Sequence, residues 1–130
     1  MIDRAVRAVR FVSGSLFALT ALGATGTAIA QAVPQSFVAS PEIYKVIAEN
    51  EQYQVIEVSW KPGQRDQFHS HPASAVYYPM DCTLRGYGPN GVLGERESKS
   101  GTAIVQKPIP SHSVENIGQS VCKLIMFEPK

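Results

Sequence analysis

The fold is decided by the stretch at residues 53–63, which reads YQVIEVSWKPG. Its side chains alternate between two faces, and one face carries the apolar set Ile56, Val58 and Trp60. Such alternation is typical of a strand with one buried face. The run is closed by Pro62-Gly63, since proline fixes φ and glycine accepts the positive φ of a turn. The stretch therefore predicts a half-buried β-strand and a tight turn.

The same alternation of short β-favouring runs and turns continues to the end of the chain. Further strands are expected over residues 66–71, 75–80, 82–87, 92–97, 102–106, 112–115 and 120–127. Turn-forming clusters separate them at 88–91, 98–101, 107–110 and 116–118. Turns at this spacing, with no long helical period, predict an all-β single domain, a sandwich or barrel, over residues 42–130. Residues 31–41 are expected to be a flexible lead-in.

The first thirty residues have the features of a secretory signal peptide. Arg4, Arg7 and Arg10 precede an uncharged apolar stretch at 11–24, and small-x-small sites end at Ala30 and Ala32. The apolar stretch is shorter than the roughly 20 residues that span a bilayer, so a stable membrane anchor is not expected. We predict a signal helix at 1–30, cleaved after Ala30 or Ala32, and an exported protein, periplasmic or secreted.

Charge excludes one class of partner. The chain has 12 basic and 11 acidic residues, and without residues 1–30 the numbers become nine and ten. A nearly neutral domain lacks the basic surface that binds phosphate backbones, so no nucleic-acid partner is expected.

The chain has three histidines, and all of them lie beyond residue 42, at His69, His71 and His112. Residues two apart on a strand project from the same face, so the imidazoles of His69 and His71 converge. Neutral imidazole is the commonest protein metal ligand. A His-x-His pair is a weak signal alone, and His112 joins it only if the fold brings the strands together.

At these residues the sequence resembles the cupins. Pro62-Gly63 followed by His69 and His71 is similar to the first cupin motif. A similarity to the second cupin motif follows at Gly101, Pro108, His112, Asn116 and Gly118. The resemblance implies a jelly-roll β-barrel, commonly a homodimer, with a metal in its mouth. It also implies that His69, His71 and His112 are three of four metal ligands.

The fourth ligand is the departure from that pattern. Metal-binding cupins usually carry glutamate four or five residues after the second histidine, where this chain has Ala75 and Val76. Strand parity places Gln67 on the face of His69, so its amide is expected to approach the site or its substrate. Tyr78 shares a face with Val76 and is expected to do the same. Parity directs the carboxylates of Asp66 and Glu115 away.

Three neutral imidazoles leave the charge of a divalent ion uncompensated and leave coordination positions open. The site is therefore expected to take a small anionic chelating ligand, such as an enolate, a thiolate or a carboxylate. The histidine set does not identify the metal among iron, zinc, manganese, nickel and copper.

Two functional hypotheses follow. One is a metal-dependent oxygenase or isomerase acting on such a small molecule. The alternative is a non-catalytic small-molecule-binding or accessory cupin whose metal site is vestigial or empty. The sequence shows no obvious general base, so no catalytic residue is assigned.

The two cysteines, Cys82 and Cys122, leave two arrangements open. An exported chain meets an oxidising compartment, where a disulfide would close a loop of about 40 residues and add roughly 3–4 kcal/mol of stability. The other arrangement is a pair of buried thiols on separate strands.

Overall fold

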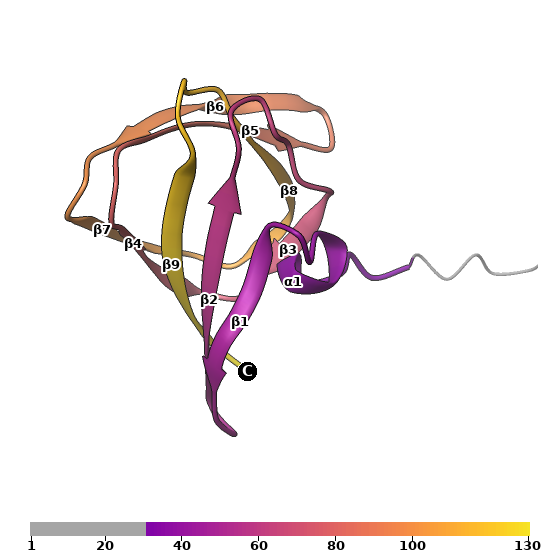
Figure 1. Cartoon of the computed structure of the whole chain (residues 1–130). Helices are drawn as coiled ribbons and strands as arrows, with labels where there is room; N and C mark the ends of the chain where they lie inside the picture. The colour runs from indigo at the N-terminus through magenta and orange to yellow at the C-terminus, as the bar shows by residue number, and fades with distance from the viewer. Residues whose placement is uncertain (1–30) are drawn as a thin grey trace, which may run out of the picture. The chain divides into compact units, whose positions relative to one another are not determined.

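The computed structural model describes residues 31–130, and the expected signal peptide at 1–30 lies outside them. Two antiparallel sheets face each other (Figure 1). The five-stranded sheet has the order β1 (Tyr44–Glu49), β2 (Tyr53–Trp60), β9 (Cys122–Pro129), β4 (Ser74–Tyr78), β7 (Thr102–Gln106). The four-stranded sheet has the order β3 (His69–His71), β8 (Ile109–Asn116), β5 (Cys82–Gly88), β6 (Gly91–Ser98). The all-β prediction is confirmed.

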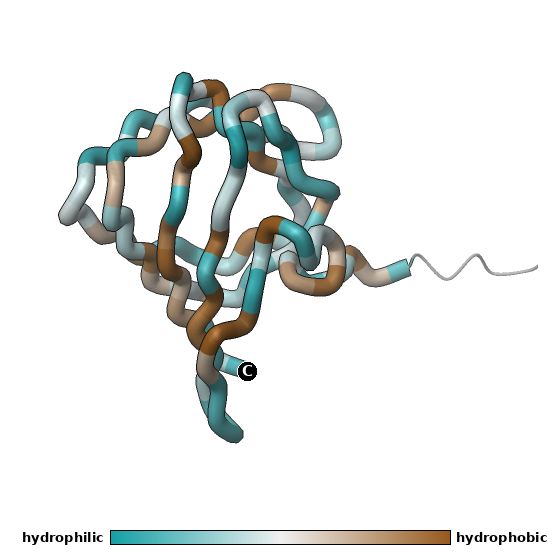
Figure 2. Tube along the Cα trace, in the orientation of Figure 1, coloured by the Kyte–Doolittle hydropathy of each residue, from teal (hydrophilic) through white to brown (hydrophobic). Residues whose placement is uncertain are grey.

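The core lies between the sheets and follows the alternation seen in the sequence. On β2 the inward residues include Ile56 and Val58, which are completely buried. On β9 every second residue from Cys122 to Glu128 is buried, and the residues between them are more exposed. Figure 2 shows the resulting change between hydrophobic and hydrophilic segments along these strands. Burial of one face thus fixes the register of both strands, because a slip by one residue would expose the whole apolar set.

A disulfide between Cys82 and Cys122 joins the two sheets. Cys82 begins β5 in the four-stranded sheet, and Cys122 begins β9 in the five-stranded sheet. Both residues are buried among the core side chains. Of the two arrangements that the sequence left open, the structure has the bridged one.

The segment expected as a flexible lead-in packs on the sheets instead. It contains α1 (Ser36–Ala39), and the side chains of Ser36 and Ser40 are buried. The backbone nitrogen of Gln67 donates to Ser40 Oγ at 2.9 Å, and Ser70 N donates to the carbonyl of Pro34 at 2.9 Å. These bonds satisfy backbone groups along β3, which is why residues 34–40 are ordered against it. No helix of the described segment has the length and apolar character needed to cross a membrane.

Candidate metal centre

The three histidines meet where β3 pairs with β8. His69 lies directly opposite His112, and His71 lies opposite Ile109, so the register shifts between the two pairs. Residues 107–110 were expected to form a turn, but β8 already begins at Ile109. The strand can contain Pro110 here because the irregular register needs no hydrogen bond from the backbone nitrogen of that residue. The antiparallel pairing of β3 with β8 brings residues about 40 positions apart in the sequence onto one face.

The imidazoles form a compact cluster inside the domain. One ligand nitrogen from each histidine lies within 4.8 Å of the other two. His69 Nε2 and His71 Nε2 are 2.9 Å apart, and the ring centroids of His69 and His112 are 4.6 Å apart. His69 and His71 are buried, and His112 is half-buried. The 2.9 Å between the Nε2 atoms of His69 and His71 suits one ion, since ligand nitrogens about 2.0–2.1 Å from a metal lie about 3 Å from each other.

The hydrogen bonds behind two of the rings fix their tautomers. His69 Nδ1 donates to the backbone carbonyl of Gln67 at 2.7 Å, and His71 Nδ1 donates to Glu128 Oε1 at 2.6 Å. A carbonyl and a carboxylate only accept, so both protons sit on Nδ1. In the neutral rings both Nε2 atoms are therefore lone-pair acceptors, and they face each other at 2.9 Å. Two lone pairs this close repel each other, so the arrangement is favourable only when both nitrogens bind a cation.

His112 completes the cluster with an unpartnered ring nitrogen. Its Nε2 is buried and has no hydrogen-bond partner among the described residues. Burial and the two neighbouring imidazoles lower the pKa of His112 to about 3. Burial also lowers the pKa of His69. His69 and His112 are therefore neutral near pH 7, the state in which imidazole binds a metal.

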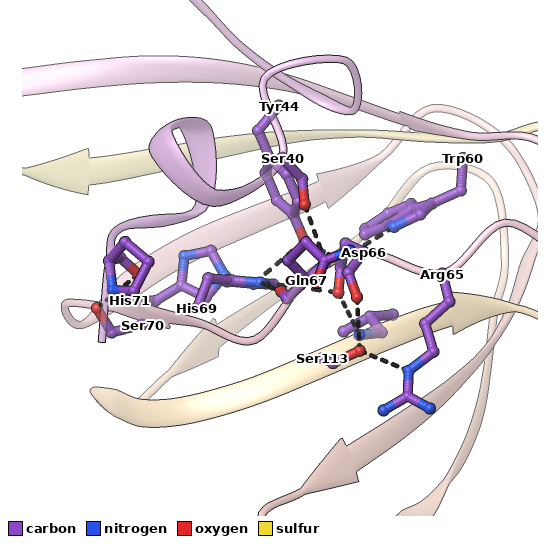
Figure 3. Close-up of polar contacts among 12 residues, drawn as sticks. Ser40, Tyr44, Trp60, Arg65, Asp66, Gln67, His69, Ser70, His71 and Ser113 are labelled. Atoms are coloured by element: carbon purple, nitrogen blue, oxygen red, sulfur yellow. Dashed lines mark hydrogen bonds and ion pairs between the residues drawn. The ribbon is translucent and has the colours of Figure 1, made fainter. Parts of the chain in front are cut away.

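Asp66 lies behind His69 at the centre of a hydrogen-bond network (Figure 3). Its carboxylate accepts from Tyr44 Oη at 2.7 Å, from Trp60 Nε1 at 3.1 Å and from Val114 N at 2.6 Å. Its Oδ1 lies 3.7 Å from His69 Nδ1. Burial raises the pKa of Asp66, and the charge of His69 and these donors oppose that rise.

The expectation that Asp66 points away is wrong. Strand parity did not apply to it, because regular pairing in β3 begins only at His69 and the preceding residues follow an irregular path. The same error affects Gln67, whose side chain is exposed and whose backbone carbonyl holds His69 instead. Glu115 points away as expected, and its carboxylate accepts from the hydroxyl of Tyr87.

Two residues of this site were not predicted from the sequence: Glu128 and Tyr44. Glu128 is buried on β9, where it bonds His71 Nδ1 and accepts from Gln54 Nε2 at 3.2 Å. The inward position of Glu128 could have been predicted, because it shares a strand face with the apolar residues Leu124 and Met126. Tyr44 gave no such signal. Its hydroxyl donates to Asp66 and lies 3.3 Å from His69 Nε2.

Two adjoining cavities lead to the histidines. A small one of about 70 Å³ is lined by His71 and His112 together with core residues. A larger one of about 340 Å³ opens between β5, β6, β7 and β8 and also has His112 in its wall. Tyr78 lines both cavities. His112 thus lies in the wall of a cavity with the volume of a small-molecule site.

Comparison with solved structures identifies the architecture. A cupin domain from Bordetella pertussis Tohama I matches with a TM-score of 0.62 at 20% identity, covering 78% of this chain and 99% of that one. An RmlC-like cupin family protein with a double-stranded β-helix fold from Methanocaldococcus jannaschii matches with a TM-score of 0.53 at 11% identity, covering 67% and 78%. The cupin domain of Schizosaccharomyces pombe Cnp3 matches with a TM-score of 0.51 at 11% identity, covering 67% and 59%.

No known family profile matches the chain, and no curated protein does. At these identities the structural likeness concerns the fold and carries no function. Residues 31–130 have the cupin fold, and the jelly-roll barrel expected from the two motifs is confirmed.

Proposed function

We propose that this cupin-fold chain binds a divalent transition metal ion through His69, His71 and His112 and captures a small anionic chelating molecule there. The observation that carries the proposal is the pair of facing Nε2 lone pairs, 2.9 Å apart. The unpartnered Nε2 of His112 supports it independently. Each of these nitrogens is buried, and a metal ion would give each of them a partner.

A proton shared by His69 Nε2 and His71 Nε2 is the alternative to a metal ion at this place. It would create a buried imidazolium, and burial disfavours that charge, as the lowered pKa of His69 shows. It would also leave His112 Nε2 without a partner. A metal ion satisfies all three nitrogens at once, so the metal explains more of the geometry.

The chain's own residues would hold and orient the ligand set. The carbonyl of Gln67 and the carboxylate of Glu128 fix the rings of His69 and His71 in the tautomer that exposes Nε2. A divalent ion in this place supplies Lewis acidity and open positions for an anionic ligand or water. Tyr78 would contact what is bound, because it lines the cavities on both sides of His112.

The activity proposed first is oxygenation or isomerisation of a small chelating anion. The second candidate is a non-catalytic binding or accessory protein, and one observation favours it. The carboxylates nearest the histidines are engaged, Asp66 by three donors and Glu128 by His71 and Gln54. Neither is free to serve as a general base at the site.

Metal analysis of the purified chain, prepared without chelators and lacking residues 1–30, tests the core of the proposal. We expect close to one equivalent of a transition metal, and a metal-free protein that fails to bind added zinc, iron or manganese would overturn it. Oxygen uptake with a panel of enolates and thiols then separates the two candidates. Full occupancy by redox-inert zinc as isolated would exclude the oxygenase.

Export and self-association are also proposed. The buried disulfide of Cys82 and Cys122 supports an oxidising compartment outside the cytoplasm. Tyr77, Val105 and Phe127 are exposed on the outer face of the five-stranded sheet and support a homodimer through that face. Fractionation of cells expressing the full chain and light scattering of the purified protein test the two proposals.

A further inference from the structure

The larger cavity beside the histidines is lined by an arginine that forms no ion pair within residues 31–130. Arg96 on β6 lines this cavity together with His112. Among the residues that the structure describes, no carboxylate forms an ion pair with Arg96. Its neighbour Glu95 is also at the cavity rim, but Arg85 holds that carboxylate at 2.7 Å. Arg96 is therefore a charge of the cavity wall that no ion pair with the described residues engages.

Strand register shows that Arg96 belongs to the inward face. Arg96 lies directly opposite Leu84, and Leu84 packs against the hydrophobic core. Residues directly opposite each other in an antiparallel pair project from the same face. Arg96 is an exposed residue, and its strand register directs the side chain toward the cavity and not toward the outer surface.

The space beside Arg96 exists because two glycines face each other. Gly86 on β5 lies opposite Gly94 on β6, and both line the cavity. With no side chains at this level, the wall is bare backbone flanked by apolar residues, including Ile104 and the largely exposed Leu93. A charged anchor, an apolar wall and a histidine cluster at the far side suit a ligand with an anionic head and an apolar body.

We propose that Arg96 anchors the carboxylate of an organic acid whose apolar body fills the cavity of about 340 Å³ in front of His112. The inference deepens the proposed function, since it names the ligand class of the same site. It differs in that Arg96 belongs to neither cupin motif and acts without the metal. Arg96 is thus a specificity-determining residue, which selects carboxylates over neutral molecules of the same shape.

The experiment compares hexanoate with its neutral amide, hexanamide, by titration followed in nuclear magnetic resonance spectra of the metal-free protein. We expect wild type to bind hexanoate about tenfold more tightly than hexanamide, because a charged hydrogen-bond donor favours the anion. Arg96→Gln should abolish the preference and leave hexanamide binding unchanged. Lys123→Gln, which removes one positive charge from an exposed position on β9, should keep the preference.

A second variant tests the cavity itself. A Cβ at Gly86 would meet only Leu93 Cβ at 3.8 Å and Gly94 O at 4.0 Å, so Gly86→Leu should fold and fill the space. It should weaken both probes at least tenfold. Equal affinity of wild type for the two probes, binding of neither, or an Arg96→Gln variant that keeps the preference would overturn the inference.

Metal binding by wild type and Arg96→Gln, measured in separate titrations of the metal-free proteins with zinc, iron or manganese, separates the two proposals. If no metal binds but the hexanoate preference depends on Arg96, the proposed metal function fails and the arginine site stands. If the metal binds and the preference is absent, the arginine site fails alone.

Discussion

Replacing Glu128 by glutamine tests whether a carboxylate behind the histidines supports the metal site. The Glu128→Gln substitution keeps the size of the side chain and removes its charge. The perturbed contact is the 2.6 Å bond between His71 Nδ1 and Glu128 Oε1. The amide oxygen can still accept that proton, so the ring keeps its orientation. What is lost is the negative charge that makes His71 Nε2 a stronger ligand.

The expected loss of metal affinity is about 10–100-fold, which corresponds to about 1.4–2.7 kcal/mol. Gln54 has to adapt as well, because its Nε2 now donates to Glu128 Oε2 at 3.2 Å and would meet an amide nitrogen. Rotation of the Gln54 amide restores that bond, so the fold is expected to remain intact. The assay is competitive titration of zinc against a chromophoric chelator, with the far-ultraviolet circular dichroism spectrum as the check on folding.

The matched control is Glu57→Gln. Glu57 is on β2 in the same sheet as Glu128, but its parity is that of the outward residues. The Glu57→Gln substitution changes the net charge by the same amount as Glu128→Gln, and Glu57 contacts none of the histidines. If the two variants bind zinc equally well, the charge of Glu128 does not act through His71, and the reasoning on the tautomers is refuted.

Three further predictions address the ligands, the disulfide and the pH dependence. His112→Ala should reduce zinc affinity more than about 100-fold, because loss of a residue that only hydrogen-bonds to a ligand already reduces metal affinity about 10–100-fold. Unchanged zinc loading in the same titration would show that His112 is not a ligand. The double variant Cys82→Ser/Cys122→Ser should lose about 3–4 kcal/mol in urea unfolding, given a bridge between residues 40 positions apart, and an unchanged midpoint would contradict this. The metal-free protein should lose stability as the pH falls from about 6.5 toward 3. Because the pKa of His112 is about 3 in the folded state, below its unfolded value near 6.5, the unfolded chain binds more protons across this window; acid unfolding that begins only below pH 3 would exclude that linkage.

Residue alternation predicted most of the fold because the two sheets enclose one continuous core. The run at 53–60 has its inward and outward sides as expected, and β2 has the bounds Tyr53–Trp60. The run at 107–110 was misassigned because two prolines there are typical of a turn. In the structure, Pro110 belongs to β8, at the irregularity next to the pair of His69 and His112. Local composition could not show a strand whose ladder is interrupted.

The ligand histidines were predictable, but the groups that hold them were less so. A spacing of two residues on a strand brings His69 and His71 together whatever the rest of the chain does. The position of Asp66 depends on the irregular path before β3, and its partners Tyr44 and Trp60 come from two other strands. Glu128 pairs with His71 across the two sheets, a contact that only the closed fold creates.

The absence of glutamate at Ala75 and Val76 does not leave the histidine cluster without negative charge. Glu128 and Asp66 place two buried carboxylates behind His71 and His69, each separated from the candidate ion by an imidazole ring. Coulomb energy falls with distance, so a carboxylate about 6 Å from the ion cancels only about a third of what a direct ligand at about 2 Å would. The ion would keep a stable set of histidine ligands and still retain positive charge toward the cavity. Such a distribution favours exchange of an anionic small molecule at the open side over a closed structural site.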